Sequence, residues 1–361
     1  MNSLMTPSWI TSTLACAVVG SSLAACSSAA RSLDSLPRAT LETSEVFPAD
    51  RSLNRAEDGV ALPDGRLIVS DQVEGLRVVA VDGTSAPFAA LHAAGYLNNP
   101  PQRHAAANGV SLEPGGTHLL VTDVLGGGIY RVAIADGATQ RVYQHRFGVN
   151  TACRDSTGAI WFTQSTECTA ESGEARMFAA ADVPVADGSL WRLDFRDGRF
   201  AVNATVVLDG LYFANGLALD ERGRTLYVAE TCGDRVLKAP LHVAAGRIGK
   251  PSVLAAIPTP DNLELDARGQ LWVASPILNE VGVLDTRTGE YRPVFRQQSL
   301  AQGDRAADFV RRGRASTPRI ALFTPEQWEP LPGPVTGIIL GPSEHDRHIS
   351  GLANALIRLP R

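Results

Sequence analysis

The segment NGLALDERGRTLYVAE (residues 215–230) decides the fold that we expect for this chain. Leu217 and Leu219 alternate with other residues in its first half, a charged stretch containing Gly223 follows, and an apolar run then returns. Alternation with a period of two marks a half-buried β-strand, and a polar, glycine-containing stretch between two such runs marks a tight turn. The segment therefore predicts a β-hairpin.

The same hairpin pattern occurs six times along the chain. Four further copies start with an acid or an asparagine and carry a glycine eight residues later; they begin at Glu57, Asn108, Asn150 and Asp261. A degenerate copy without this glycine begins at Thr336. The copies start 42 to 75 residues apart, which leaves room for two more strands in each unit. This period predicts an all-β fold, a six-bladed β-propeller, because a β-sandwich does not repeat one hairpin six times.

Composition excludes several other classes of protein. The chain has 361 residues, of which 44% are hydrophobic, so it can fill a large core and is not disordered as a whole. Its formal net charge of −5 argues against nucleic acid as a partner, because phosphate binding needs a basic surface. No uninterrupted run of 18 apolar residues occurs, so several membrane-spanning helices are not expected.

The N-terminus has the pattern of a secretory leader. Residues 9–25 are apolar and rich in small side chains, and they end in Leu-Ala-Ala before Cys26, which resembles the bacterial lipobox. We therefore expect a signal peptide at residues 1–25, a lipid-modified Cys26 with a tether over residues 26–49, and the propeller over residues 50–361. The protein would be exported and held at the cell envelope by its lipid anchor alone, facing the periplasm. No Lys or Arg precedes Arg31, so an ordinary signal peptide is the alternative.

Three cysteines remain after the leader. A disulfide between Cys168 and Cys232 is possible, with Cys153 as a buried free thiol.

Three long intervals interrupt the repeat, and they cover residues 92–107, 165–187 and 295–334. They are either binding loops or surface decoration, and the sequence does not separate these two interpretations.

The first position of each repeat points to a metal site. In a propeller the innermost strands line a central channel, and one position per blade faces its axis. All six of these positions carry a side-chain oxygen, and none carries nitrogen or sulfur ligands: Glu57, Asn108, Asn150, Asn215, Asp261 and Thr336. Carboxylate and amide oxygens around a wide channel suit Ca²⁺. The alternative is that these residues only cap strands and bind the neighbouring blade.

The repeats resemble the senescence marker protein/gluconolactonase family and its paraoxonase relatives, which are calcium-dependent six-bladed propellers that hydrolyse lactones and esters. The resemblance rests on residues 57–59, 213–230 and 259–275. It implies one catalytic Ca²⁺ and a set of five ligands: Glu57, Asn150, Asn215, Asp261 and Asn262. It also implies a small-molecule lactone or ester as substrate.

The sequence departs from the paraoxonases at the second blade. Those enzymes have a histidine there as a proposed base, whereas Asn108 cannot accept a proton at neutral pH and is expected to hydrogen-bond the substrate. We therefore expect the metal to polarise the carbonyl group and Asp261 to serve as base or nucleophile. One alternative is a non-catalytic binding propeller stabilised by calcium. Another is a metal-free condensing enzyme of the strictosidine synthase type, which would need a catalytic glutamate in the channel.

Overall fold

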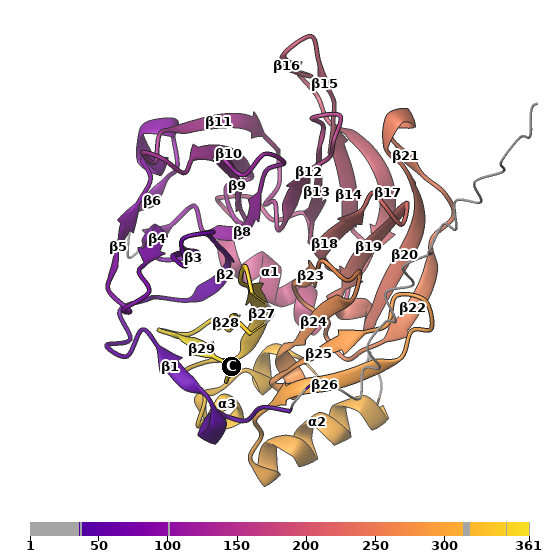
Figure 1. Cartoon of the computed structure of the whole chain (residues 1–361). Coiled ribbons are helices and arrows are strands. Elements are labelled where there is room, and N and C mark those ends of the chain that lie inside the picture. The colour runs from indigo at the N-terminus through magenta and orange to yellow at the C-terminus, as the bar shows by residue number, and fades with distance from the viewer. Residues whose placement is uncertain (1–35, 37, 100–101, 313–317, 344, 361) are drawn as a thin grey trace, which may run out of the picture. The chain divides into compact units, whose positions relative to one another are not determined.

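The computed structural model describes residues 36, 38–99, 102–312, 318–343 and 345–360. Six antiparallel sheets are arranged around a centre, so the prediction of a six-bladed β-propeller is confirmed (Figure 1). The expected leader over residues 1–25, Cys26 and most of the expected tether lie outside the described residues.

The first strand of every blade is the innermost one, and each contacts the innermost strand of the next blade. These six strands are β2 (Ala56–Ala61), β8 (Ala107–Leu112), β12 (Ala152–Arg154), β18 (Ala214–Asp220), β23 (Leu263–Leu265) and β27 (Val335–Leu340). Each repeat found in the sequence begins in or directly before one of these strands.

The other strands complete the blades in antiparallel order. Blade one has β3 (Leu67–Asp71), β4 (Gly75–Val79) and β5 (Ser85–Phe88), and blade two has β9 (His118–Asp123), β10 (Gly128–Ala133) and β11 (Thr139–Gln144). Blade three has β13 (Ile160–Gln164), β14 (Gly188–Leu193) and β17 (Thr205–Leu211), and blade four has β19 (Thr225–Glu230), β20 (Arg235–His242) and β22 (Ser252–Ala256). Blade five has β24 (Leu271–Ser275), β25 (Glu280–Leu284) and β26 (Tyr291–Arg296). Short extra pairings are made by β15 (Phe195–Arg196) with β16 (Arg199–Phe200), by β21 (Arg247–Ile248) with β20, and by β6 (Asn98–Asn99) with β7 (Gln102–Arg103).

The sixth blade is built from both ends of the chain. Behind β27 come β28 (Arg347–Gly351), β29 (Leu356–Arg358) and finally β1 (Glu45–Phe47), whose Val46 pairs with Ile357. The propeller therefore begins at Glu45, five residues before the expected boundary at residue 50. The sequence did not reveal this strand because it is only three residues long and belongs to no repeat.

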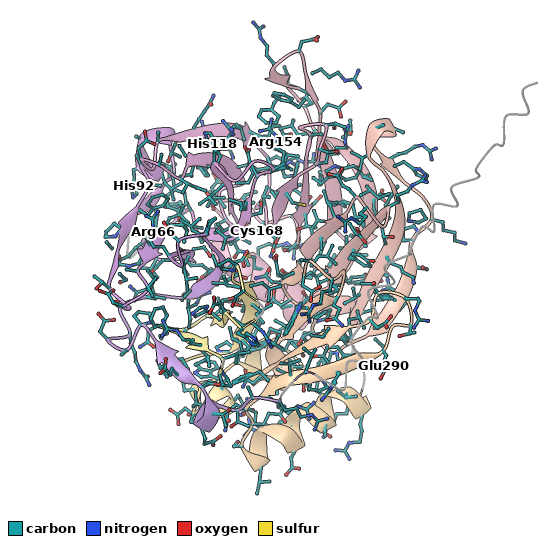
Figure 2. The ribbon with its side chains drawn as sticks, viewed as in Figure 1. Arg66, His92, His118, Arg154, Cys168 and Glu290 are labelled. Carbon is teal, nitrogen blue, oxygen red and sulfur yellow. The ribbon has the colours of Figure 1, made fainter. Side chains whose placement is uncertain are left out.

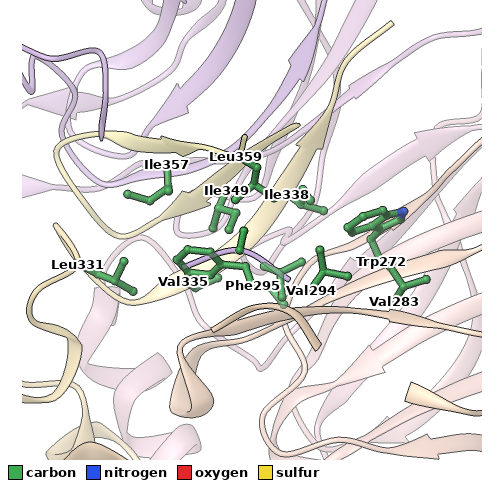
Figure 3. Close-up of a cluster of buried hydrophobic side chains, with 13 residues drawn as sticks. Trp272, Val283, Val294, Phe295, Leu331, Val335, Ile338, Ile349, Ile357 and Leu359 are labelled. Atoms are coloured by element: carbon green, nitrogen blue, oxygen red, sulfur yellow. The ribbon is translucent and has the colours of Figure 1, made fainter. Parts of the chain in front are cut away.

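Apolar side chains fill the space between neighbouring blades. Figure 3 shows one such cluster, in which Trp272 and Val283 of the fifth blade lie against Ile338 and Ile349 of the sixth. Each of these side chains is almost completely buried. Burial of a large apolar side chain contributes about 1.5–3 kcal/mol, so these interfaces are the main source of stability of a propeller.

The innermost strands carry β-bulges at the first position of the repeat. The pairing register shifts between Ala56 and Gly59, between Ala107 and Val110, and between Ala214 and Leu217. A bulge turns a side chain away from its regular direction in the strand. The asparagine or acid at this position is therefore turned relative to the apolar residues that follow it.

Among the described residues, two of the three long intervals contain α-helices. Residues 165–187 include α1 (Gly173–Asp182), and residues 295–334 include α2 (Leu300–Arg312) and α3 (Pro325–Trp328). In the part of the chain that the structure describes, none of the helices has both the length and the apolar character needed to cross a bilayer.

Gly216 provides a test of the close contact between blades four and five. A Cβ atom at this position would lie 2.5 Å from the amide nitrogen of Leu263 and 2.6 Å from the carbonyl oxygen of Asp261. Gly216→Ala is therefore expected to lower the free energy of unfolding by about 1–3 kcal/mol, measured by urea titration. Gly303→Ala in α2 is the control, because its Cβ would meet only Gln298 Oε1, at an ordinary contact distance of 3.6 Å, and should leave stability equal or slightly higher. Equal stability of both variants would contradict the prediction.

Candidate functional site

All six first positions of the repeat line one cavity. This cavity has a volume of about 380 Å³ and lies at one end of the channel. Its floor consists of residues of the innermost strands and the turns that precede them: Glu57, Asn108, Asn150, Asn215, Asp261 and Thr336. Each of these side chains is at most 8% exposed. Asn262 is equally buried and lies beside this floor, where its amide Nδ2 donates a hydrogen bond to Glu57 Oε1 at 3.1 Å.

At two of the six positions the side chain bonds to a neighbouring blade, whereas Asn150 Oδ1 accepts from the adjacent Thr151 Oγ1 at 3.1 Å. Asn108 Oδ1 accepts from Gln72 Nε2 at 2.8 Å, and Asn108 Nδ2 donates to the carbonyl oxygen of Asn150 at 3.3 Å. Thr336 Oγ1 donates to the carbonyl oxygen of Glu57 at 2.8 Å. For Asn108 and Thr336, the structure therefore shows the contacts with neighbouring blades that were the alternative to a ligand role.

Three oxygens of the expected ligand set have no hydrogen-bond partner. They are Glu57 Oε2, Asn215 Oδ1 and Asn262 Oδ1, and all three are shielded from solvent. A buried oxygen without a donor is costly, and a cation removes this cost by accepting the lone pair. No group of three or more His, Cys, Asp or Glu side chains suited to a metal occurs among the described residues. The set is instead a mixture of two carboxylates and three amides, which are oxygen ligands that fit Ca²⁺.

The carboxyl groups at the floor are strongly perturbed. Burial raises the pKa of Asp261 to about 8, with a smaller contribution from Asp58 and an opposing hydrogen bond from Asn215. Burial and the neighbouring Asp261 and Asp58 raise the pKa of Glu57 well above its ordinary value. The pKa of Asp58 rises to about 6, again through burial, against hydrogen bonds from the backbone of Val110 and Gly59. Three acids held this closely create a field that attracts a cation.

The backbone of the floor is fixed by hydrogen bonds from neighbouring blades. Thr122 Oγ1 donates to the carbonyl oxygen of Asn150 at 2.5 Å, and Thr163 Oγ1 donates to that of Asn215 at 2.6 Å. The amide of Gly216 donates to the carbonyl oxygen of Asp261 at 3.3 Å. These bonds fix the backbone that carries the side chains of the floor.

The cavity has a roof made by two of the long intervals. Met177 and Phe178 of α1 cover it from one interval, and Ile320, Phe323 and Trp328 cover it from the other. These two intervals therefore lie over the site. None of the described side chains of the third interval, residues 92–107, lines the cavity.

Sequence reasoning missed several lining residues. Gln72 follows the second strand of blade one, where its side chain joins Arg55 Nε to Asn108. Arg319, which is 1% exposed, also contacts the cavity. Gln72 could have been identified from its position in the sequence, because it directly follows Asp71, the acid that ends the first repeat. Arg319 had none, since it lies in a stretch without periodicity.

The histidines, and the three cysteines that the structure describes, lie outside the lining. His92 Nδ1 is 3.0 Å from the carbonyl oxygen of Tyr96, and Figure 2 shows His92 on the outer side of the blades. The possible disulfide is absent, because Cys168 and Cys232 are free thiols in separate surroundings. Cys168 Sγ contacts the carbonyl oxygen of Gly173 at the start of α1, whereas Cys232 Sγ lies 3.9 Å from that of Ala180 near its end.

Comparison with known proteins agrees with this geometry. Residues 128–296 match the family model described as the SMP-30/gluconolactonase/LRE-like region. The chain contains an SMP-30/gluconolactonase/LRE-like region. The resemblance stated from the repeats is thereby confirmed.

Individual relatives of this chain are distant. A strictosidine synthase-like protein 10 of Arabidopsis thaliana is 32% identical over 131 residues, which are 36% of this chain and 32% of that protein. The match thus spans about a third of the length of this curated relative. A gluconolactonase of Xanthomonas campestris is 20% identical, with a TM-score of 0.58 over 86% of this chain and 87% of the other. A calcium-binding regucalcin of Agrobacterium tumefaciens is 13% identical, with a TM-score of 0.59 over 90% and 94%. At these identities the structures establish the common fold.

The raised pKa of Asp261 predicts a dependence of stability on pH when a chelator is present. The folded state retains a proton up to about pH 8, whereas the unfolded chain releases it near the ordinary pKa of 3.8. The contribution of the Asp261 carboxyl group to the free energy of unfolding is therefore fully present at low pH. It is lost as the pH rises from about 4 to about 8. Between about pH 5.5 and pH 8, the wild type should lose on the order of 2–4 kcal/mol more than Asp261→Asn in chemical unfolding.

Asp261 also raises the pKa of Glu57, so Asp261→Asn reduces that shift and adds to the difference between the two proteins. Groups that do not interact with Asp261 cancel in this comparison. Burial lowers the pKa of His145 to about 4, so its stabilising effect is lost toward acid pH, equally in both proteins. Added Ca²⁺ should reduce the loss in the wild type, because a cation compensates the ionised carboxylates. The same pH dependence in the wild type and in Asp261→Asn would show that this carboxyl group is not perturbed.

Proposed function

We propose that this protein is a calcium-dependent hydrolase of lactones or esters. The observation that carries the proposal is the set of three buried oxygens without donors, on Glu57, Asn215 and Asn262, next to the carboxyl group of Asp261 at the floor of a cavity. The SMP-30/gluconolactonase/LRE-like region supports the lactonase class of this activity.

The residues that would hold the ion are those of the expected ligand set: Glu57, Asn150, Asn215, Asp261 and Asn262. When bound, Ca²⁺ supplies a Lewis acid that polarises the carbonyl group of the substrate. The three amide side chains, of Asn150, Asn215 and Asn262, supply neutral oxygen atoms. The net charge of the site is therefore set by Glu57 and Asp261.

Asp261 is the residue that we assign to proton transfer. Its carboxylate lies at the cavity floor, where a water molecule entering from the cavity can approach it. In the proposed step this water adds to the carbonyl carbon and gives its proton to a carboxylate oxygen of Asp261. The C–O bond of the lactone or ester then breaks, and the leaving oxygen takes the proton back from Asp261. Asn215 orients the carboxylate through its side-chain hydrogen bond.

A second candidate function is a metal-free reaction of the strictosidine synthase type. The local identity to the Arabidopsis protein favours it, and Glu57, with its raised pKa, would be the catalytic acid in the channel. The oxygens without donors argue for the hydrolase instead, because a metal-free site would leave them without a partner. Dependence on calcium separates the two functions.

Turnover of phenyl acetate and of a γ-lactone tests the proposed hydrolase. A chelator should abolish turnover and Ca²⁺ should restore it, and Asp261→Asn should reduce kcat/KM by about 10²–10⁴-fold, as expected for loss of a general base. Asp209→Asn, which changes an exposed carboxylate of β17, is the matched control. Calcium-dependent melting without any turnover would favour the binding propeller, and turnover unaffected by chelation would contradict the proposal.

We also propose that the protein is exported and anchored by a lipid on Cys26. The support is the sequence of the leader alone, because Cys26 lies outside the described residues. Expression of the full chain in a bacterium should place it in the membrane fraction, and Cys26→Ser should release it from that fraction. Cys153→Ser is the control, since its thiol lies within the propeller. Membrane association of Cys26→Ser equal to that of the wild type would contradict lipid anchoring.

A further inference from the structure

The cavity is polar on one side and apolar on the other. Its floor carries the oxygens of the innermost strands, whereas its roof presents hydrocarbon, thioether and aromatic side chains. The main contributors to the roof are Met177, Phe178, Ile320, Phe323 and Trp328. This division follows the origin of the residues, because the repeat supplies the floor and the two long intervals supply the roof.

The roof is fixed to the propeller. Arg319 donates to the carbonyl oxygens of Ala181 and Cys232, each at 3.4 Å, and to Asp234 Oδ2 at 3.0 Å. The amide of Ile320 donates to Asp182 Oδ1 at 2.7 Å. These contacts connect three parts of the chain: the end of α1, the turn at residues 232–234 in blade four, and the interval that contains Phe323. The apolar side chains of the roof are thus held over the floor by a buried polar network.

Sugar lactones do not match this lining. A polyhydroxylated lactone carries a hydroxyl group on most of its carbons, and each needs a hydrogen-bond partner when it is buried. Met177, Phe178 and Phe323 offer none. Asn108 and Thr336 on the floor already bond to the scaffold, and the free oxygens are those assigned to the cation. The other large polar side chains of the lining also have protein partners: Gln72 joins Arg55 to Asn108, and Arg319 makes the contacts given above. A substrate with an alkyl or aryl group would instead bury it against the roof and gain affinity.

We propose that the cavity selects lactones or esters that carry an apolar alkyl or aryl group, in preference to polyhydroxylated sugar lactones. The inference rests on the proposed hydrolase function. In this arrangement the ester group lies at the floor near Asp261, and the apolar group lies under Phe323 and Ile320. The substrate class therefore differs from that named for the structurally similar gluconolactonase.

Three lactones test this selectivity: γ-butyrolactone, γ-nonalactone and glucono-δ-lactone. The alkyl chain of γ-nonalactone should raise kcat/KM at least about tenfold over γ-butyrolactone, since each buried methylene group adds discrimination of this order. Glucono-δ-lactone should be no better a substrate than γ-butyrolactone. A higher kcat/KM for glucono-δ-lactone than for γ-nonalactone would overturn the inference while leaving the hydrolase function intact.

Phe323→Ala examines the roof directly. It should lower kcat/KM for γ-nonalactone by about 10–100-fold and change that for γ-butyrolactone by less than about threefold, because only the longer substrate reaches the roof. Leu322→Ala is the matched control, since Leu322 is adjacent in the chain but does not line the cavity. Equal losses for both substrates in Phe323→Ala, with normal unfolding, would contradict a role in selectivity.

A binding measurement separates failure of this inference from failure of the proposed function. If no lactone or ester is hydrolysed, the hydrolase function is wrong, and calorimetric titration with 4-hydroxynonanoate and gluconate still tests the cavity. Preferential binding of 4-hydroxynonanoate that Phe323→Ala weakens and Leu322→Ala preserves would support the apolar selectivity. Preferential binding of gluconate, or binding of 4-hydroxynonanoate unaffected by Phe323→Ala, would overturn it.

Discussion

Hydrogen bonds between successive innermost strands are the constraint on which the site depends. The amide of Asn262 donates to the carbonyl oxygen of Thr336 at 3.0 Å, and the hydroxyl of Thr336 donates in turn to that of Glu57 at 2.8 Å. Similar bonds join the other blades around the channel. They bring carboxyl groups from the first and fifth blades close together, although charge repulsion and burial both oppose this approach. The affinity for a cation that we infer is a consequence of this enforced proximity.

The fold and the floor of the site were predictable because both follow the repeat. The hairpin that starts at Asn215 identifies an innermost strand, and its register alone brings Asn215 to the same cavity as Glu57 and Asp261. A periodic fold converts an equivalent sequence position into an equivalent place in space. The family resemblance added Asn262, which no spacing argument had indicated and which donates a hydrogen bond to Glu57.

The differences between equivalent positions were not predictable. Asn108 and Asn215 begin their repeats with the same residue, yet Asn108 is bonded through both ends of its amide, whereas Asn215 keeps an oxygen without a donor. The difference arises because Gln72, which directly follows the second strand of blade one, donates a hydrogen bond to Asn108 Oδ1. The roof was equally inaccessible, because Phe323 and Arg319 lie in a segment without periodicity, and β1 was too short to produce a strand pattern.

The sixth blade gives the order in which the site can be assembled. Its outermost strand, β1, precedes the other five blades in the chain and its neighbour, β29, follows them, so β1 stays unpaired until those five blades have been synthesised. Glu57 and Asp261 are held in one ring only when β27 lies between their blades. The ring that we propose as an ion site is therefore completed in a single step, when β27 takes its place between the first and fifth blades.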